Sequence, residues 1–514
     1  MKPTNLIQKI RVRSLLILVL VGLIGMTMIP VPIKNVSGNQ NRSSTLSEKI
    51  TENLISIDSV QAINDHIYDI EEEERFEVSD GDEYQPENAT CKYISDKAYI
   101  FLKNGLPELQ NFVGIGDRFD NIMFPIMLDN FAAPSDIDGN GRVVILYSEM
   151  PLGVGGYFSP RDLDLGSGYD GEIVYVNAQS SGSESTLIHE LQHLVKQGYD
   201  PDEKIWFNEG CSRLSETLYD YARGINDTMG VTIPTGVSLL YWDYQNARAD
   251  TDYAAVNSFL SYLYDQYGSA NLSAIYQASS GGQKLQSKTA IMHILNQYFP
   301  TLSFEQLFLN WVIASTVDNK YSGNVREYYY EKFDCGPNPI RFPRTDDIYA
   351  KNYPYDETWE ILPWETKIYQ FRNFINPNQV NVSIDFPSDS QDHLFGVNIM
   401  KEISKNDSYE HIIESFMMTA ENISEGFQTT YNASDEGFDF FYLTISHLDG
   451  GEGGYYPDIP SSEQHIEVNV MIYAGEKVSD TSTGTTTTNQ VSYEIPFLLL
   501  FLLAIGINRK PKKD

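Results

Sequence analysis

The chain has 514 residues, of which 71 are Asp or Glu and 36 are Lys or Arg, so its formal net charge is −35. This acidic balance argues against nucleic-acid binding, which needs clustered basic residues, and the length favours two or three domains. Three cysteines (Cys91, Cys211 and Cys335) exclude a disulfide-dense scaffold and a four-cysteine zinc or iron–sulfur site.

The N-terminal region predicts export followed by an acidic segment. In residues 1–36, four basic residues precede a short apolar run, which is typical of a signal peptide or signal-anchor. Residues 37–90 form an acidic N-terminal segment with a predicted helix over 46–63 and acidic runs at 71–74 and 80–83. We interpret these runs as a solvated linker or a propeptide-like segment.

Strands and helices alternate between residues 91 and 200. Strands are predicted over residues 97–102, 142–147 and 172–176, and helices within 119–131 and over 186–198. The strand at 142–147 is apolar after its first residue, so we expect it to be buried. The strand at 172–176 alternates in polarity, which favours an exposed or edge position.

Helices dominate after residue 200, and strands return near residue 365. The residues Phe207, Cys211, Leu214, Leu218 and Ala222 fall at helical spacing, and further helices are predicted over 253–267, 290–298 and 304–314. Strands are then predicted over 380–384, 440–445 and 466–472, with Gly-rich and Asn-rich turns between them. The chain is therefore expected to be α+β, with a β-sandwich over residues 360–475.

The C-terminal end carries an attachment signal. Residues 479–490 form a Ser/Thr-rich linker, and residues 491–514 combine an apolar stretch with a basic cluster. The stretch is shorter than the roughly 20 residues that span a bilayer, and it resembles the sorting tails of archaeal and bacterial surface proteins. A plain membrane anchor is the alternative. Nine N-x-[ST] sequons fit a glycosylated exterior, so we expect an exported protein at the cell surface, anchored to the membrane or envelope.

The segment HELQH at residues 189–193 carries the clearest chemistry. His189 and His193 are four residues apart, so one helix face presents both imidazoles to a single Zn²⁺ ion. Glu190 lies where it could deprotonate a zinc-bound water. With 8 His in 514 residues, the expected number of chance H-E-x-x-H matches is on the order of 0.01. A chance surface motif is therefore the weaker interpretation.

A zinc site needs a third protein ligand. The metzincin pattern is excluded, because Lys196 and Tyr199 stand where it requires Gly and His. The sequence Asn208-Glu209-Gly210 lies downstream, and this arrangement resembles gluzincins. The resemblance implies that Glu209 is the third ligand, while the alternative is a surface glutamate in the first turn of a helix.

Two further roles follow from the resemblance to gluzincins. Glu216 lies two turns after Glu209 and could accept a hydrogen bond from a ligand histidine; a solvated charge is the alternative. Thermolysin-like enzymes have an acidic residue four positions after the glutamate ligand. This chain has Arg213 at that position, which argues against the thermolysin-like subfamily. Gluzincins also have a downstream Tyr or His that stabilises the oxyanion, for which Tyr253 is the first choice and His293 the second.

Two other features leave alternatives open. Asp136, Asp138 and Asn140 match the opening of an EF-hand loop, but Tyr147 stands where the bidentate Glu would be, so a plain Asp/Gly turn is favoured over a Ca²⁺ site. Cys211 is expected to be buried in a helix. If a disulfide exists, Cys91–Cys335 is the remaining pairing.

The order of several segments narrows the resemblance. GGYFSPRDL, EIVYVNA, HELQH, WFNEG and DYAAVNSFLSYLYDQYG occur in the order seen in hyicolysin-type metallopeptidases, over roughly residues 90–345. The resemblance implies a two-lobed zincin domain over residues 91–345, with the active-site helix above a sheet. Residues 172–176 would then lie near the edge at which a peptide substrate adds as a strand.

The sequence therefore predicts an extracellular, zinc-dependent endopeptidase of gluzincin type that acts on protein or peptide substrates. His189, His193 and Glu209 would hold zinc, and Glu190 and Tyr253 would be catalytic. The alternatives are a non-peptidase zinc hydrolase, or a surface adhesin or structural glycoprotein with a degenerate zincin domain.

Overall fold

The computed structural model describes residues 66–79, 83–180, 182–225, 237–242, 249–317, 326–333, 347–349, 354–372, 379–386, 393–405, 408–438, 440–455 and 466–474. These residues belong to one compact unit, Asn64–Asp514. The expected signal, the helix over 46–63, the linker and the C-terminal tail lie outside the described residues. Within the described part, no helix is long and apolar enough to cross a bilayer.

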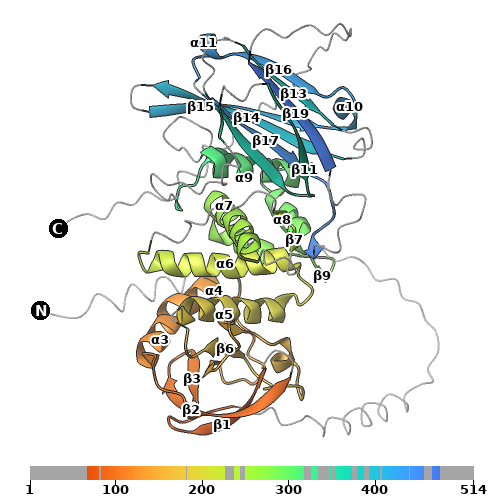
Figure 1. The fold of residues 1–514 in the computed structure, drawn as a ribbon. Coiled ribbons are helices and arrows are strands. Elements are labelled where there is room, and N and C mark those ends of the chain that lie inside the picture. The colour runs from red at the N-terminus through yellow and green to blue at the C-terminus, as the bar shows by residue number, and fades with distance from the viewer. Residues whose placement is uncertain are drawn as a thin grey trace, which may run out of the picture. The chain divides into compact units, whose positions relative to one another are not determined.

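A mixed six-stranded sheet begins the unit (Figure 1). Its strands, in spatial order, are β1 (Glu73–Ser79), β2 (Tyr84–Ile94), β3 (Ala98–Lys103), β4 (Val143–Ser148), β6 (Ile173–Asn177) and β5 (Gly156–Tyr157). The central strands β3, β4 and β6 are parallel, whereas β1, β2 and β5 join antiparallel. The sheet curls, so that β1 and β2 wrap one side of it.

Both faces of this sheet are buried. Ile100, Ile145 and Val174 point into the core shared with the helices. The alternate residues Phe101 and Leu146 point into a second core, which is closed by the curled strands β1 and β2. Parallel strands that are covered on both faces have near-continuous apolar sequences, and residues 143–147 of β4 are such a sequence.

Two expectations about this sheet were wrong. The acidic runs at 71–74 and 80–83 were interpreted as a solvated linker or a propeptide-like segment, but residues 73–79 form β1 and the chain enters β2 at Tyr84. Phe76 and Val78 alternate with charged residues and bury against the sheet. The strand at 172–176 was expected to be exposed or at an edge, but β6 pairs with both β4 and β5 and is buried. Its side chains alternate between two buried cores, and β5 follows it as the last described strand of the sheet.

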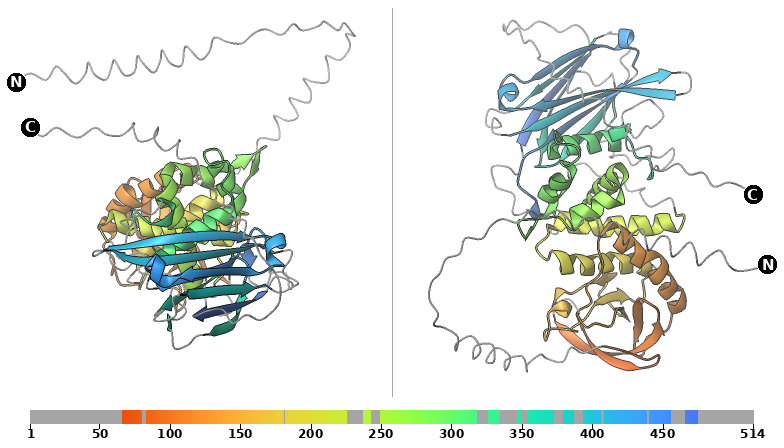
Figure 2. Two further views of the ribbon diagram at one scale, coloured as in Figure 1. Left: turned by 90° about the horizontal axis from the view of Figure 1, so that it is seen from above. Right: turned by 180° about the vertical axis from the view of Figure 1, so that it is seen from behind.

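Helices follow the sheet in chain order. They are α3 (Phe112–Arg118), a π-helical turn (Phe119–Met123), α4 (Phe124–Asn130), α5 (Ser183–Tyr199), α6 (Ile205–Ala222), α7 (Ala249–Tyr276, interrupted at Gly268), α8 (Ser287–Leu295) and α9 (Phe304–Val317). Short 3₁₀ turns cover Pro160–Leu163 and Arg326–Tyr328, and β8 (Ser279–Ser280) pairs with β9 (Gln283–Lys284). Helix α5 lies between the sheet and α6, as Figure 1 and the right-hand view of Figure 2 show.

Close packing fixes α6 against α7. A Cβ at Gly210 would lie 2.8 Å from Leu260 Cδ2, so glycine lets the two helices approach. The predicted core positions Phe207, Cys211 and Leu214 are fully buried, which confirms the helical periodicity. Ala222, at the end of the same series, is exposed.

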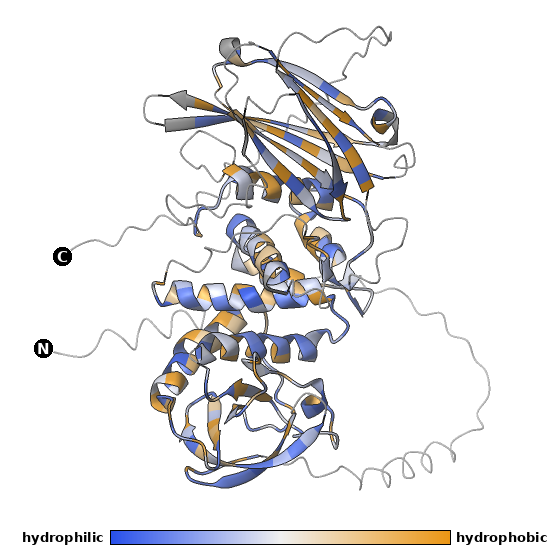
Figure 3. Cartoon of the chain, in the orientation of Figure 1, coloured by the Kyte–Doolittle hydropathy of each residue, from blue (hydrophilic) through white to orange (hydrophobic). Residues whose placement is uncertain are grey.

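Two antiparallel-rich sheets form the C-terminal part. One contains β10 (Asp347–Tyr349), β12 (Thr366–Arg372), β17 (Phe440–His447), β14 (Phe395–Lys405) and β15 (Ser408–Met418) in that order, and the other contains β11 (Tyr355–Ile361), β19 (Ile466–Ala474), β13 (Gln379–Asp385) and β16 (Phe427–Asn432). Their inward residues, such as Val397 and Val470, share one core, and the strands alternate in hydropathy (Figure 3). Two short helices, α10 (Ala420–Ile423) and α11 (Ala433–Glu436), lie in the connections. This mixture of helices and sheets fits the expected α+β class.

The sequon at Asn381 is buried. Asn381 is 8% exposed on β13, where its Oδ1 accepts a hydrogen bond from the Thr430 hydroxyl. Because an acceptor asparagine must be accessible, the folded structure does not present this position for glycosylation.

Candidate metal centre

Helix α5 presents two imidazoles on one face. Leu187, Ile188 and Leu191 are buried in the core, which fixes the rotation of the helix. His189 and His193, one turn apart, therefore both face α6, and their Nε2 atoms lie 3.2 Å apart.

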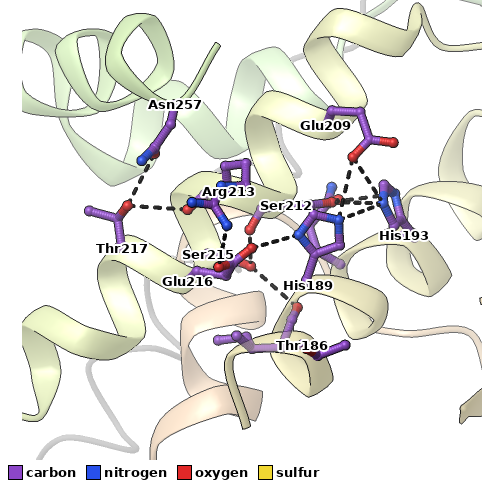
Figure 4. A network of polar contacts seen from close by, with 12 residues as sticks. Thr186, His189, His193, Glu209, Ser212, Arg213, Ser215, Glu216, Thr217 and Asn257 are labelled. Atoms are coloured by element: carbon purple, nitrogen blue, oxygen red, sulfur yellow. Dashed lines mark hydrogen bonds and ion pairs between the residues drawn. The ribbon is translucent and has the colours of Figure 1, made fainter. Parts of the chain in front are cut away.

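Helix α6 brings a carboxylate to the same point. Glu209 Oε2 lies 3.4 Å from His189 Nε2 and 3.5 Å from His193 Nε2, and Figure 4 shows the three side chains converging. These residues form a group that could hold a metal ion. The ligand set expected from the sequence is thus brought together by two adjacent helices.

The spacing of the three atoms suits zinc. Bonds of about 2.0–2.2 Å at tetrahedral angles separate ligand atoms by roughly 3.3–3.6 Å, which matches the observed triangle. Glu209 Oε2 is also buried and has no hydrogen-bond partner among the described residues. A buried carboxylate oxygen without a donor is costly, so this atom fits a cation.

Outer contacts orient both histidines. His189 Nδ1 lies 2.7 Å from Glu216 Oε1, and the other oxygen of Glu216 accepts a hydrogen bond of 2.6 Å from Arg213. His193 Nδ1 lies 3.3 Å from Asn208 Oδ1. Each Nδ1 thus faces an oxygen and each Nε2 faces the shared point, which is the arrangement of metal-binding histidines.

The electrostatics of the group favour a positive charge. Burial lowers the pKa of His189, but Glu209 and Glu216 outweigh it and raise the pKa to about 10. Burial would raise the pKa of Glu209, yet His193 and His189 hold it well below its usual range. The cluster therefore stabilises a cation among its carboxylates.

Glu190 lies beside this group at the sheet edge. It is 8% exposed, and its burial raises the pKa of the carboxyl, against the lowering influence of His189 and His193. The Phe158 backbone adds a smaller lowering influence on the same pKa. A Cβ at Gly156 would lie 3.5 Å from Glu190 Cγ and 2.5 Å from Tyr175 O, so only glycine fits between β6 and the helix.

Of the two expected oxyanion residues, Tyr253 lies near the site. Its ring centroid is 6.0 Å from that of His189, and the Arg213 guanidinium lies 5.8 Å from the tyrosine ring centroid. His293 lies on α8 and has no contact with the three ligand candidates among the interactions described.

The expected calcium residues form a turn. Carboxylate oxygens of Asp136, Asp138 and Glu172 lie close to one another, and Asn140 also contacts Asp138. Asn140 directs its amide nitrogen at Asp138 Oδ2 at 2.6 Å, and the backbone N–H of Ile137 donates to Glu172. Backbone and amide donors occupy these carboxylates, as in the plain Asp/Gly turn that the sequence favoured, so calcium gains no support.

The two described thiols take no part in the centre. Cys91 and Cys211 are buried and free, and Cys335 lies outside the described residues. Sequence reasoning did not single out Asn208 for a role. The available signal was its place beside Glu209.

Comparison with known proteins agrees with this geometry. Over 213 residues the chain is 30% identical to the neutral metalloprotease ShpI of Staphylococcus hyicus, a match that covers 35% of this chain and 47% of that protein. The chain thus spans about half the length of that relative. The similarity supports a relationship to metallopeptidases. No family profile matches the chain.

Comparison with solved structures gives only weak similarities. A chain of Desmodium yellow mottle tymovirus is 10% identical, with a TM-score of 0.16, and covers 25% of this chain and 89% of its own. The Yersinia pseudotuberculosis-derived mitogen is 7% identical, with a TM-score of 0.13, over 26% of this chain and 97% of its own. TM-scores this low do not indicate a common fold.

Proposed function

We propose that the protein is a zinc-dependent endopeptidase of gluzincin type, with His189, His193 and Glu209 as the zinc ligands. The observation that carries the proposal is the triangle of 3.2, 3.4 and 3.5 Å between their facing atoms, one of which is a buried carboxylate oxygen with no hydrogen-bond donor among the described residues. When bound there, zinc would supply a Lewis acid that makes water more acidic and polarises a carbonyl group.

The residues around the triangle would take distinct roles. Glu190 would take a proton from the attacking water and then deliver it to the leaving amine. Burial raises the pKa of its carboxyl, which favours uptake of that proton. Tyr253 would donate a hydrogen bond to the oxyanion of the tetrahedral intermediate.

A peptide substrate would bind along β5. Because β5 is the last described strand of the sheet and Gly156 adjoins Glu190, an extended peptide added there would pass the metal centre. A cavity of about 330 Å³ adjoins this strand and is lined by Tyr84, Val154, Tyr157 and Phe158, among others. It would accept an apolar side chain of the substrate.

We also propose a domain organisation and a cellular location for the protein. Residues 91–345 would form the two-lobed zincin domain, to which β1 and β2 add, and residues 360–475 would form the accessory β-sandwich. The basic and apolar ends of the chain support export and attachment at the cell surface.

Cleavage of denatured casein by the purified full chain tests the function. The proposal expects cleavage that a zinc chelator abolishes and that added zinc restores. Zinc binding without cleavage of any protein substrate would favour a non-peptidase zinc hydrolase. Absence of bound zinc would favour a surface adhesin with a degenerate zincin domain.

A further inference from the structure

The segment over residues 237–242 joins the catalytic helices to the C-terminal sheets. The Ser238 hydroxyl donates to Pro363 O at 2.6 Å, and the Leu239 N–H donates to Trp364 O at 2.9 Å. This segment contains β7 (Tyr241–Trp242), and residues 238–242 are buried. Its position is therefore set by contacts from residues more than 100 positions later in the chain.

A second contact comes from residues 448–455, which we name the docking loop. Its strand β18 (Gly454–Tyr455) pairs in parallel with β7, and the Gly454 N–H donates to Leu240 O at 3.1 Å. The indole N–H of Trp206, at the start of α6, donates to Glu452 O at 3.2 Å. Figure 1 shows this late segment of the chain beside β7.

Gly453 makes the docking loop fit. Its φ is +92°, and a Cβ at this position would lie 2.5 Å from Leu240 O and 2.7 Å from Trp206 Cδ1. A side chain would therefore displace the loop from both β7 and α6.

Two aromatic rings, those of Trp242 on β7 and Tyr253 on α7, lie in sequence between β7 and the metal centre. Trp242 is 1% exposed, and its ring meets that of Tyr253 edge-on at a centroid distance of 4.9 Å. The Tyr253 ring in turn lies 6.0 Å from that of His189. Such packed aromatic contacts restrict the orientation of each ring.

We propose that the docking loop and Trp242 position Tyr253 for catalysis, so that the C-terminal sheets form part of the active-site support. This inference rests on the proposed function, in which Tyr253 stabilises the oxyanion. Trp242 and Gly453 are positioning residues, because they act through Tyr253.

The test compares two glycine variants of the full chain. Gly453→Ala should displace β18 from β7, whereas Gly437→Ala is a matched control: Gly437 also has a positive φ (+72°) in the C-terminal part, but a Cβ there would meet nothing within 4 Å. Relative to this control, Gly453→Ala should lower kcat at least about tenfold and leave KM within about twofold, with equal zinc content. If Gly453→Ala does not fold, Gly451→Ala replaces it, because its Cβ would lie 3.0 Å from Tyr241 Oη.

Two further readouts separate positioning from general destabilisation. In a Tyr253→Phe background, Gly453→Ala should lower kcat no further, because the group that it positions is already absent. Amide hydrogen exchange over residues 249–256 should be faster in Gly453→Ala than in Gly437→Ala.

Failure of the positioning role can be distinguished from failure of the proposed peptidase function. Equal kcat in the two glycine variants, or independent effects of Gly453→Ala and Tyr253→Phe, would overturn the positioning role. If the unmodified chain cleaves no protein, the proposed function fails, and hydrogen exchange still decides whether the docking loop orders the start of α7. Unchanged exchange there would overturn the inference.

Discussion

His189 Nδ1 lies 2.7 Å from Glu216 Oε1, although the two residues are 27 positions apart and belong to different helices. This contact directs the opposite ring nitrogen, Nε2, towards His193 and Glu209. Arg213 holds the second carboxylate oxygen of Glu216, so the imidazole is oriented by a carboxylate that is itself fixed.

Removal of this carboxylate should weaken zinc binding. We expect Glu216→Ala to lower zinc affinity about 10- to 100-fold and Glu216→Gln, which keeps an acceptor oxygen, to lower it less. Competition with a chromophoric chelator measures the affinity. Asp220→Asn, on the same helix, is the control. Equal affinity in Glu216→Ala and Asp220→Asn would contradict the orienting role.

Glu190→Gln should separate metal binding from catalysis. The amide cannot take up a proton, so kcat for peptide cleavage should fall by about 10²- to 10⁴-fold while zinc content stays unchanged. Glu149→Gln, at a half-exposed carboxylate after β4, should behave as the unmodified chain. Full activity of Glu190→Gln in a peptide assay would exclude Glu190 as the base.

A buried ion pair supports the end of the active-site helix. Lys196 Nζ lies 2.9 Å from Glu203 Oε2, and both side chains are 2% exposed. Lys196→Met should lower the free energy of unfolding by about 3–5 kcal/mol, because it leaves the Glu203 charge buried without its partner. Urea-induced unfolding measures this change.

Two variants serve as controls for the buried ion pair: one also removes the Glu203 charge, and the other breaks an exposed ion pair. Lys196→Met combined with Glu203→Gln should recover part of the loss, since the lone charge is gone while Oε1 can still accept from Ser287. Lys92→Met, which removes a surface pair with Glu71, should cost under about 1 kcal/mol. A loss at Lys196 no larger than that at Lys92 would refute the account.

Asp162 should make stability depend on pH. Burial raises the pKa of its carboxyl from 3.8 to about 6, so the folded chain binds this proton more tightly than the unfolded chain does. Its contribution to the free energy of unfolding is therefore greatest below pH 4 and falls as pH rises from about 4 to 6.

The variant Asp162→Asn isolates this effect. The unmodified chain should lose about 2–3 kcal/mol relative to Asp162→Asn across that pH range, and the difference should be constant above about pH 7. Urea unfolding of both proteins at several pH values measures it. A difference that does not change with pH would mean that Asp162 titrates normally.

Local periodicity explains what the sequence predicted. The spacing of His189 and His193 and the apolar positions of α5 and α6 depend only on helix geometry, and the burial of Cys211 followed from the same periodicity. These features need no knowledge of the tertiary fold. Glu209, in contrast, was expected as a ligand only from the resemblance to gluzincins, because helix geometry does not show which helices come together.

Long-range packing explains what the sequence missed. Strand β6 looked like an edge because its alternation does not reveal a second buried face or the pairing with β5. The charges in residues 73–90 masked strands β1 and β2, which depend on burial against β3. Contacts such as Trp206–Glu452, 246 positions apart, leave no local pattern.

The central claim is that two histidines and one glutamate bind one zinc ion. X-ray absorption at the zinc edge of the zinc-loaded full chain tests it most directly. The account predicts one zinc per chain with two imidazoles among only nitrogen and oxygen ligands at about 2.0–2.2 Å, and loss of this zinc in Glu209→Ala. A sulfur ligand at about 2.3 Å, or an unchanged zinc spectrum in Glu209→Ala, would contradict it.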